Sequence, residues 1–220
     1  MHVLIIGSGE GGRLALDLLR KSEEHLVVGF VDDNKKLKGK TIDGVKVLGT
    51  TKDLKKLRKE ANGFIVGIGC SNLKARMETF KLAKRLGFAP INAIHKTAII
   101  DESVQLGEGL TIFAGTVINR EAKIGDNVTI YSGTVVEHQC EIGDHVYIGP
   151  GAHLSGNVKV GENTFIGVGA DFVQGLRIGK NSIIGAGAVV LKNVPDNVVA
   201  AGVPLRVLRK RTKDEVGVRN

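Results

Sequence analysis

The stretch that decides the fold is residues 130–154, Ile-Tyr-Ser-Gly-Thr-Val-Val-Glu-His-Gln-Cys-Glu-Ile-Gly-Asp-His-Val-Tyr-Ile-Gly-Pro-Gly-Ala-His-Leu. Every sixth residue in it is aliphatic, and the same apolar period continues in both directions without a break. The full series is Ile100, Leu106, Ile112, Ile118, Ile124, Ile130, Val136, Ile142, Ile148, Leu154, Val160, Ile166, Phe172, Ile178, Ile184 and Val190. A short fixed period of this kind is typical of a stacked-coil repeat.

Six residues make one short strand and one corner, so three such sides close a triangular coil of eighteen residues. The apolar residue and the small or β-branched residue two places before it point inward, because side chains alternate along a strand. Residues eighteen apart, such as Ile118 and Val136, should therefore stack in parallel ladders. A sandwich or barrel of ordinary strands would need hairpin turns at irregular spacing. We predict an all-β parallel β-helix over residues 95–208, followed by a charged C-terminal tail over 209–220.

Residues 1–94 read as a Rossmann-like α/β half-domain. A buried strand at 3–6 runs into the glycine-rich turn 7–12, and an amphipathic helix and a second strand follow up to Asp32 and Asp33. Glycines at 7, 9 and 12 and an acid twenty residues later match the dinucleotide-binding fingerprint. Further elements are expected as strands over 45–48 and 63–69 and as helices over 52–60 and 73–86.

This N-terminal domain is about half of a doubly wound sheet, with room for one mononucleotide. We therefore interpret the glycine turn as a nucleotide-sugar site, and an NAD site is the alternative. An acid that ends the second strand can hold a ribose hydroxyl of such a ligand.

Composition narrows the classes of function. The net charge is +8, which suits either nucleic acid or small phosphorylated ligands. No basic stripe is interleaved with aromatic residues, so nucleic acid is not expected as a partner. The two cysteines, Cys70 and Cys140, have no disulfide or metal-ligand pattern. No apolar run approaches membrane-spanning length, and the N-terminus runs straight into a glycine turn instead of a signal peptide. We expect a cytoplasmic protein without membrane insertion.

The corner after Val136 differs in sequence from most other corners, which carry ordinary turn residues. It reads Glu137-His138-Gln139, and the positions eighteen residues away from His138 are Arg120 and Gly156. A glycine stacked on this histidine is expected to leave open space, where a neutral imidazole could take a proton from an amine or a hydroxyl. The alternative is an ordinary surface histidine at a turn.

Two other histidines compete for this role. His145 replaces the asparagine of a Gly-Asp-Asn corner and is expected to be solvated, whereas His153 is expected to face outward from a flat side. Some solenoid enzymes bind zinc through histidines shared between subunits. Because His138, His145 and His153 lie on three different rows, we predict no metal site.

The chain resembles the sugar O-/N-acetyltransferases of the sialic-acid O-acetyltransferase and bacillosamine-precursor N-acetyltransferase group. The resemblance covers nearly all 220 residues. The motifs that carry it are 7–12, 31–33, 66–69, 94–96, 136–143, 155–158, 185–190 and 201–204. It implies a left-handed β-helix, a homotrimer and acetyl-CoA as co-substrate, and it links the chain to polysaccharide biosynthesis.

The resemblance also implies residue roles. The histidine that matches His138 is the general base, and the residue after it is typically an acid, which is Gln139 here. The position seven before the histidine is often asparagine and is Tyr131 here. Either Gln139 or Glu137 is expected to support the base. Coenzyme A is expected between neighbouring subunits at Tyr147, Gly156, Val168 and Ala186. Lys192, by its charge and position at the end of the coils, is expected to meet a CoA phosphate.

The same resemblance implies which residues bind the nucleotide of the sugar substrate. The predicted substrate-binding residues are Gly9, Glu10, Gly11, Asp32 and Asp33.

These observations lead to one functional prediction. The protein is expected to be an acetyl-CoA-dependent N-acetyltransferase that acts on a UDP- or GDP-linked amino sugar. The alternatives are a sugar O-acetyltransferase of the sialic-acid type, a non-catalytic solenoid scaffold that senses a nucleotide, and a zinc-dependent hydratase.

Overall fold

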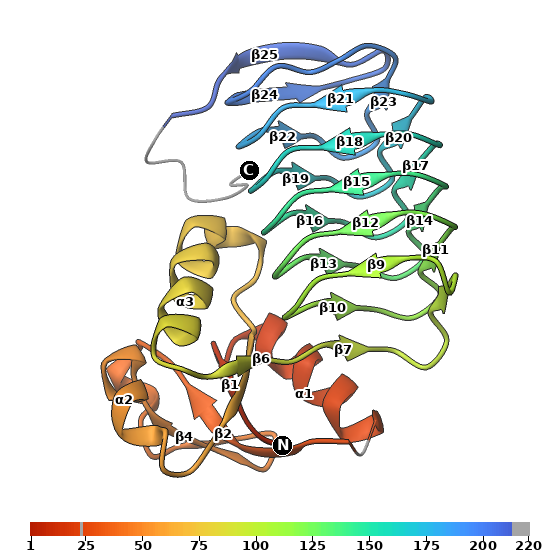
Figure 1. Ribbon diagram of the computed structural model, residues 1–220. Helices are drawn as coiled ribbons and strands as arrows, with labels where there is room; N and C mark the ends of the chain where they lie inside the picture. The colour runs from red at the N-terminus through yellow and green to blue at the C-terminus, as the bar shows by residue number, and fades with distance from the viewer. Residues whose placement is uncertain (23, 213–220) are drawn as a thin grey trace. The chain divides into compact units, whose positions relative to one another are not determined.

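A computed structural model describes residues 1–22 and 24–212 of the chain (Figure 1). The chain divides into two compact units, residues 1–94 and the part from His95 onward. The first is an α/β unit and the second is a solenoid of short parallel strands.

The N-terminal unit is built on one largely parallel sheet in the order β3-β4-β2-β1-β5-β6. Its strands are β1 (His2–Ile6), β2 (Leu26–Val31), β3 (Thr41–Ile42), β4 (Val45–Gly49), β5 (Gly63–Val66) and β6 (Ala89–Pro90), with β7 (Ala93–Ile94) at the end of the unit. The helices are α1 (Glu10–Ser22), α2 (Leu54–Leu57) and α3 (Leu73–Arg85), and the 3-10 turns are η1 (Lys35–Leu37), η2 (Thr51–Asp53) and η3 (Cys70–Asn72).

Strand β1 is buried on both faces. Leu4 and Ile6 belong to a cluster with Phe64 of β5 and Phe80 of α3. Because side chains alternate along a strand, Val3 and Ile5 point to the opposite face, and they too are fully buried. This explains why the strand reads as a continuous apolar run.

Two predicted helix boundaries differ from the structure. Helix α1 begins at Glu10, so Gly11 and Gly12 form its first turn instead of preceding it. The helix predicted over 52–60 is wrong, since only the turn η2 and the single helical turn α2 form there. Leu54 and Leu57 are the only buried side chains of that segment, and two anchors hold only one turn against the core.

The second unit is a left-handed parallel β-helix with three flat sides (Figure 1). Sheet 1 contains β10 (Thr111–Ile112), β13 (Thr129–Ile130), β16 (Tyr147–Ile148), β19 (Phe165–Ile166), β22 (Ile183–Ile184), β24 (Val198–Ala201) and β25 (Arg206–Lys210). Sheet 2 contains β8 (Ile99–Ile100), β11 (Val117–Ile118), β14 (Val135–Val136), β17 (His153–Leu154), β20 (Asp171–Phe172) and β23 (Val189–Val190). Sheet 3 contains β9 (Gln105–Leu106), β12 (Lys123–Ile124), β15 (Glu141–Ile142), β18 (Lys159–Val160) and β21 (Arg177–Ile178).

The predicted register of eighteen residues is confirmed. Ile118 pairs with Val136, and Val136 pairs with Leu154, in parallel ladders. The inward side chains of the six-residue series are all buried in one column from Ile112 to Val190. Leu106 departs from the expected column, because it is 36% exposed in the first coil of the stack.

Glycines serve the corners in two ways. Gly133 has φ of +69°, in the left-handed region that favours glycine. Gly161 has no positive φ, but a Cβ added there would lie 2.5 Å from the backbone nitrogen of Lys180 in the next coil. The first kind bends the chain, and the second lets neighbouring coils approach closely.

The solenoid ends in an antiparallel pair, β24 with β25. Arg209 and Lys210 therefore belong to a strand, which corrects the prediction of a tail starting at Arg209. Residues 211 and 212 follow this strand without regular structure, and residues 213–220 of the predicted tail lie outside the described residues.

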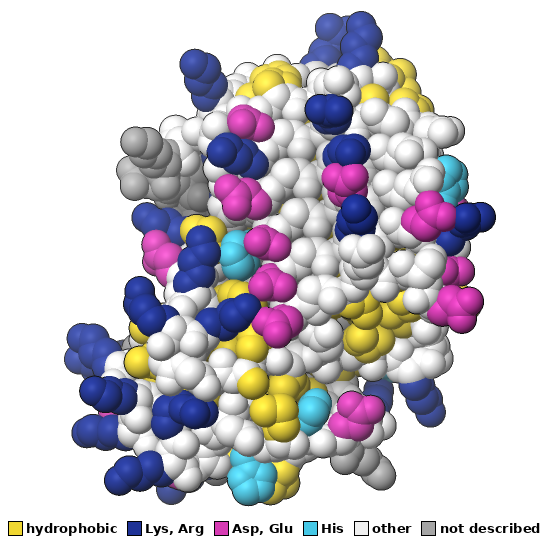
Figure 2. All heavy atoms as spheres, in the orientation of Figure 1, with side chains coloured by type: hydrophobic (Ala, Val, Ile, Leu, Met, Phe, Trp, Pro, Cys, Tyr) yellow, Lys and Arg dark blue, Asp and Glu magenta, His cyan; other side chains and the backbone are white. Residues whose placement is uncertain are grey.

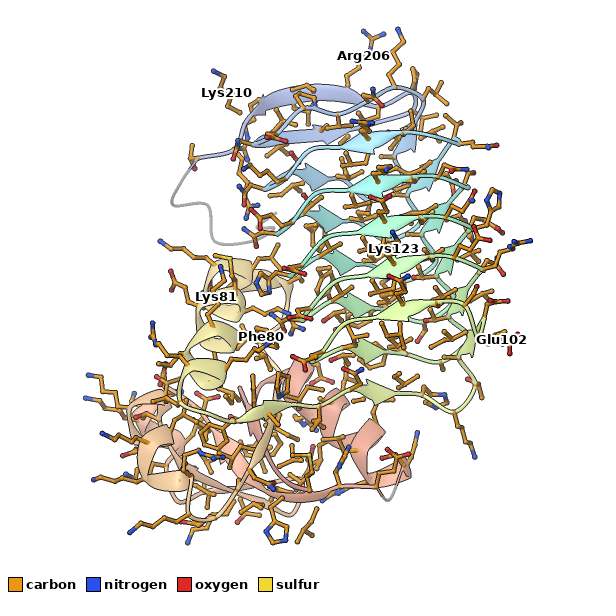
Figure 3. The ribbon with its side chains drawn as sticks, viewed as in Figure 1. Phe80, Lys81, Glu102, Lys123, Arg206 and Lys210 are labelled. Carbon is orange, nitrogen blue, oxygen red and sulfur yellow. The ribbon has the colours of Figure 1, made fainter. Side chains whose placement is uncertain are left out.

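A column of charged side chains runs along the outer face of sheet 3 (Figure 2). It includes Lys123, which is labelled in Figure 3, and the ion pair between Lys159 and Glu141. A shallow depression of about 1090 Å³ covers this face. Within residues 1–22 and 24–212, no helix has both the length and the apolar character needed to cross a membrane.

Candidate active site

His138 lies at the corner between sheets 2 and 3, after β14 and before β15. We call this the His138 corner; it comprises residues 119–121, 137–139 and 155–157 in three successive coils. The imidazole lies against Gly156 of the next coil, since a Cβ added to Gly156 would come within 2.4 Å of the ring atoms Cε1 and Nε2. Gly156 does not leave the open space that the sequence suggested, because the imidazole itself occupies it.

The two neighbours of His138 point away from its ring nitrogens. The Glu137 carboxylate accepts a hydrogen bond from the backbone N–H of His138, at 3.3 Å. The Gln139 side chain donates through Nε2 to Glu121 of the preceding coil, at 2.8 Å. Neither predicted supporting residue therefore has a hydrogen bond to the imidazole among the described contacts.

Glu121 is a residue that sequence reasoning missed. Its carboxylate binds both the guanidinium of Arg120 and the amide of Gln139. These hydrogen bonds, that from Arg120 first, lower the pKa of the Glu121 carboxyl below its ordinary value. The available signal was the register, because Glu121 stands eighteen residues before Gln139 and so must stack beside it.

The other two histidines differ in their surroundings. His145 is buried, and its Nδ1 lies 3.0 Å from Nδ2 of Asn127, which corrects the prediction of a solvated side chain. His145 and Asn127 are eighteen residues apart and stack at the same corner of successive coils. His153 is exposed as predicted, and its Nδ1 lies 2.9 Å from a carboxylate oxygen of Asp171.

Within one chain, the predicted coenzyme A residues fall into separate groups. Val168 and Ala186 are exposed and follow one another in successive coils at the corner between sheets 1 and 2. Gly156 and the exposed Lys192 lie on the row of His138, at the opposite edge of sheet 2. Tyr147 is buried on sheet 1, with its ring 5.1 Å from that of Tyr131 and 5.3 Å from that of Phe165.

In the N-terminal unit, the loops after β1 and β2 meet. Asp32 accepts hydrogen bonds from both the N–H and the hydroxyl of Ser8, at 2.9 and 2.6 Å, and from the N–H of Asn34. Partial burial favours the protonated acid, but these hydrogen bonds outweigh it and lower the pKa of Asp32. Ser8 is a second residue that the sequence analysis missed, although it stands inside the glycine turn.

The two other predicted acids are engaged as well. Asp33 accepts from the N–H and the hydroxyl of Thr51, each at 2.8 Å. Glu10 opens α1 and forms an ion pair with Arg13 at 3.2 Å. Asp32, Asp33 and Glu10 are thus held in place at the carboxyl edge of the sheet, where open α/β sheets bind their ligands.

The glycines of these loops differ in what requires them. A Cβ on Gly12 would lie 1.9 Å from the carbonyl oxygen of Gly7, and one on Gly11 would lie 2.7 Å from that of Gly67. Gly9 has no atom within 4 Å of such a Cβ and no positive φ. Internal packing explains the glycine at 11 and at 12, whereas Gly9 faces space that a ligand can enter.

No group of three or more His, Cys, Asp or Glu side chains suited to a metal ion occurs within residues 1–22 and 24–212. Cys140 stands two places before Ile142 and is buried in the column, as the alternation of inward positions predicts, and burial raises the pKa of its thiol to about 11. Such a thiol is a packing residue with almost no thiolate at neutral pH.

Comparison with known proteins identifies both units. Residues 2–81 match the PglD N-terminal domain, and residues 121–156 and 157–192 match the bacterial transferase hexapeptide repeats. PerB from Caulobacter crescentus, solved with CoA and GDP-perosamine, is 37% identical, with a TM-score of 0.88 over 94% of this chain and 97% of that one. The chain belongs to the PglD-type sugar acetyltransferases.

Other relatives agree with this assignment. The acetyltransferase domain of PglB from Neisseria gonorrhoeae FA1090, solved with acetyl coenzyme A, is 32% identical, with a TM-score of 0.87 over 94% of this chain and 98% of that one. The UDP-N-acetylbacillosamine N-acetyltransferase of Bacillus subtilis (strain 168) is 36% identical over 118 residues. That alignment spans 51% of this chain and 51% of the relative, so the chain matches about half of that curated protein's length.

Family membership confirms three predictions. The protein is an acetyltransferase, acetyl-CoA is its acetyl donor, and the fold is the α/β unit followed by the hexapeptide β-helix. The roles of individual residues in this acetyltransferase stay predictions.

Proposed function

We propose that this acetyltransferase transfers the acetyl group of acetyl-CoA to the amine of a nucleotide-linked amino sugar, with His138 as general base. The observation that carries the proposal is the contact of the His138 ring with Gly156. A side chain at position 156 would displace the imidazole, so the glycine preserves one particular position of the partly exposed His138 ring. The relative PerB, solved with CoA and GDP-perosamine, supports the substrate class.

The proposed chemistry is a direct transfer. His138 takes a proton from the attacking amine, whose nitrogen forms a bond to the acetyl carbon of the thioester. The carbon–sulfur bond then breaks, and the proton passes from the imidazolium to the departing thiolate of coenzyme A. Solved structures of a perosamine N-acetyltransferase with one histidine replaced by asparagine or alanine hold both CoA and GDP-perosamine.

The nucleotide of the sugar is proposed to bind at the N-terminal glycine turn. The open position Gly9, the start of α1 at Glu10 and the ionised Asp32 surround the carboxyl edge of the sheet. Backbone N–H groups at a helix N-terminus favour a phosphate, and a carboxylate can accept hydrogen bonds from ribose hydroxyls. Gly11 and Asp33 then act by holding this edge together, through their contacts with Gly67 and Thr51.

Coenzyme A is proposed to bind between two subunits of a homotrimer. Val168 and Ala186 lie at one edge of sheet 2, and Gly156 and Lys192 lie at the other, so one chain does not gather the set. A neighbouring copy that turns its sheet 2 toward the same threefold axis would bring its Val168 corner beside the first chain's His138 corner. The outer row of sheet 2 supports this arrangement, because it includes the partly exposed valines Val117, Val135 and Val189. Tyr147, which is buried, is the weakest member of the predicted set.

An O-acetyltransferase that acts on a sugar hydroxyl is the second candidate, since the same base serves a hydroxyl. The identity of the product distinguishes the two reactions. As acetyl-CoA and nucleotide sugars are cytoplasmic metabolites, the proposed reaction belongs in the cytoplasm.

Two experiments test the proposal. Acetyl-CoA, NAD, UDP and GDP, singly and in pairs, should be screened by thermal shift, where a ligand at a hundred times its dissociation constant adds about 2.7 kcal/mol. Stabilisation by acetyl-CoA and by one nucleoside diphosphate is expected, and stabilisation by NAD alone would overturn the proposal.

Turnover should then be assayed with GDP-perosamine, UDP-N-acetylbacillosamine and free sialic acid, for the wild type and for His138→Asn. The variant should lose about 10²- to 10⁴-fold in kcat. Near-normal turnover would rule out His138 as the base.

A further inference from the structure

The carboxylate of Glu121 joins the two residues that flank His138 in space. Arg120, stacked eighteen residues before His138, bonds to Oε1 through Nε at 3.2 Å and also through Nη2. Gln139, which follows His138, donates to Oε2 at 2.8 Å. The backbone of Glu121 is itself fixed, because its N–H donates to the hydroxyl of Ser103 at 2.8 Å.

This carboxylate also determines which charges face the imidazole. On its own coil His138 has Glu137, and the coil before it carries Arg120 and Glu121. One coil further, Asp101 interacts with Arg120, while the coil after His138 contributes the uncharged Ser155, Gly156 and Asn157 to the corner. Lys123 and Lys159 of sheet 3 line the same depression as Glu121 and Gln139, and Lys159 is paired with Glu141. Arg120 is therefore the one cation of this described corner, and Glu121 is its direct partner.

Glu121 is ionised near neutral pH. The hydrogen bond from Arg120, followed by that from Gln139, lowers the pKa of its carboxyl, and the charge of His138 acts in the same direction.

We propose that Glu121 is a positioning residue for the base: it neutralises Arg120 and fixes Gln139, so that the imidazolium formed during acetyl transfer faces no unpaired cation. The inference rests on the proposed function of His138. General-base catalysis moves a positive charge onto the imidazole in the transition state, and an unpaired guanidinium in the stacked position would oppose that charge. Glu121 acts through Arg120 and Gln139 and needs no contact with either substrate.

The test is a charge cycle measured as kcat and KM. The assay uses acetyl-CoA with whichever of GDP-perosamine and UDP-N-acetylbacillosamine is turned over. Glu121→Gln should lower kcat about tenfold, which is the effect expected of one unpaired charge near the base when solvent partly screens it. Both KM values should stay within about twofold of wild type. Arg120→Gln added to Glu121→Gln should restore most of the loss, because the opposing cation is then gone as well. Adding about 0.5 M KCl should also reduce the loss, since salt screens exposed charges.

Glu102→Gln is the matched control. Glu102 lies one coil below Arg120 on the same row, and its side chain projects outward from the solenoid (Figure 3). Its kcat should equal that of the wild type. If Glu121→Gln lowers the melting temperature, the single variant Arg120→Gln decides instead, and it should match or exceed the wild-type kcat.

Three results would overturn the inference: an unchanged kcat in Glu121→Gln, a loss that Arg120→Gln does not restore, or a loss of kcat in Arg120→Gln alone. His138→Asn in the same assay separates this inference from the proposed function. An inactive His138→Asn with a normal Glu121→Gln removes only the role of Glu121, whereas an active His138→Asn removes the proposed mechanism.

Discussion

At the scale of single residues, Gly156 is the position where a small change has the most specific consequence. Alanine is compatible with the backbone there, since the φ of Gly156 is not positive, but its Cβ would meet the His138 ring at 2.4 Å. Gly156→Ala should therefore displace the imidazole while the coil stays folded. We expect kcat to fall about a hundredfold, the effect of misplacing a catalytic group by about 1 Å, with little change in melting temperature.

The neighbouring substitution Ser155→Ala is the control, and its kcat should stay near the wild-type value. Normal turnover by Gly156→Ala would mean that the ring position seen here is not the one that reacts.

Gly9 offers a second residue-scale test, on the nucleotide side. A Cβ added to Gly9 meets no atom of the chain within 4 Å, whereas one on Gly12 would overlap the carbonyl of Gly7. Gly9→Ala should keep the wild-type melting temperature and raise the KM of the nucleotide sugar about tenfold, because the methyl group enters space that the phosphates would use. Gly12→Ala should instead lower the melting temperature. A Gly9→Ala enzyme with unchanged KM would place the nucleotide elsewhere.

At the scale of elements, each coil of the solenoid is stabilised by the coils on either side. Ile166 is fully buried between coils, whereas Ile100 belongs to the first coil and is partly exposed. Ile166→Ala should cost about 2–5 kcal/mol of unfolding free energy, and Ile100→Ala less than half of that. Urea denaturation of the two variants measures the difference. Equal losses would show that the coils do not depend on their position in the stack.

The elements also show how far sequence reasoning reaches. The period of six residues predicts the coils because one rule, apolar residues inward, governs every strand of the column. The same rule predicted the burial of Cys140. The prediction failed at His145. A histidine can replace an asparagine in a row of buried corner residues that stack from coil to coil, and composition alone does not reveal this.

The candidate site was predictable in part for the same reason. His138 and Gly156 are one register step apart, so the sequence could pair them. The partners of Gln139 could not be read in that way, because side-chain direction at a corner depends on the charges of the neighbouring coil. Ser8 was missed because its role appears only when the loops after β1 and β2 are brought together.

At the scale of the whole molecule, the proposed trimer makes activity depend on the outer face of sheet 2. Val135→Asp places a charge in the middle of that face, and a buried unpaired charge is costly at an interface. We expect monomers in analytical ultracentrifugation and at least a tenfold loss of kcat, because the Val168 corner of a neighbour would no longer reach the His138 corner.

The same change at Val207 of β25, a 49% exposed residue outside sheet 2, should leave the assembly and the turnover intact. A fully active monomer of Val135→Asp would show that one chain builds the complete coenzyme A site.

The eighteen-residue register has a consequence for ligand length. His138 and Lys192 stand three coils apart on one row, and adjacent parallel strands are separated by about 4.8 Å, so the row spans about 14 Å between them. The last coil shows that a corner can change length without disturbing a ladder, because Ile183 pairs with Val199 at a spacing of sixteen residues. Only a whole coil changes the distance along the solenoid axis. Adding or removing one coil between His138 and Lys192 would therefore change the length of the extended cofactor that fits between them by one strand spacing, about 4.8 Å. No intermediate length is available.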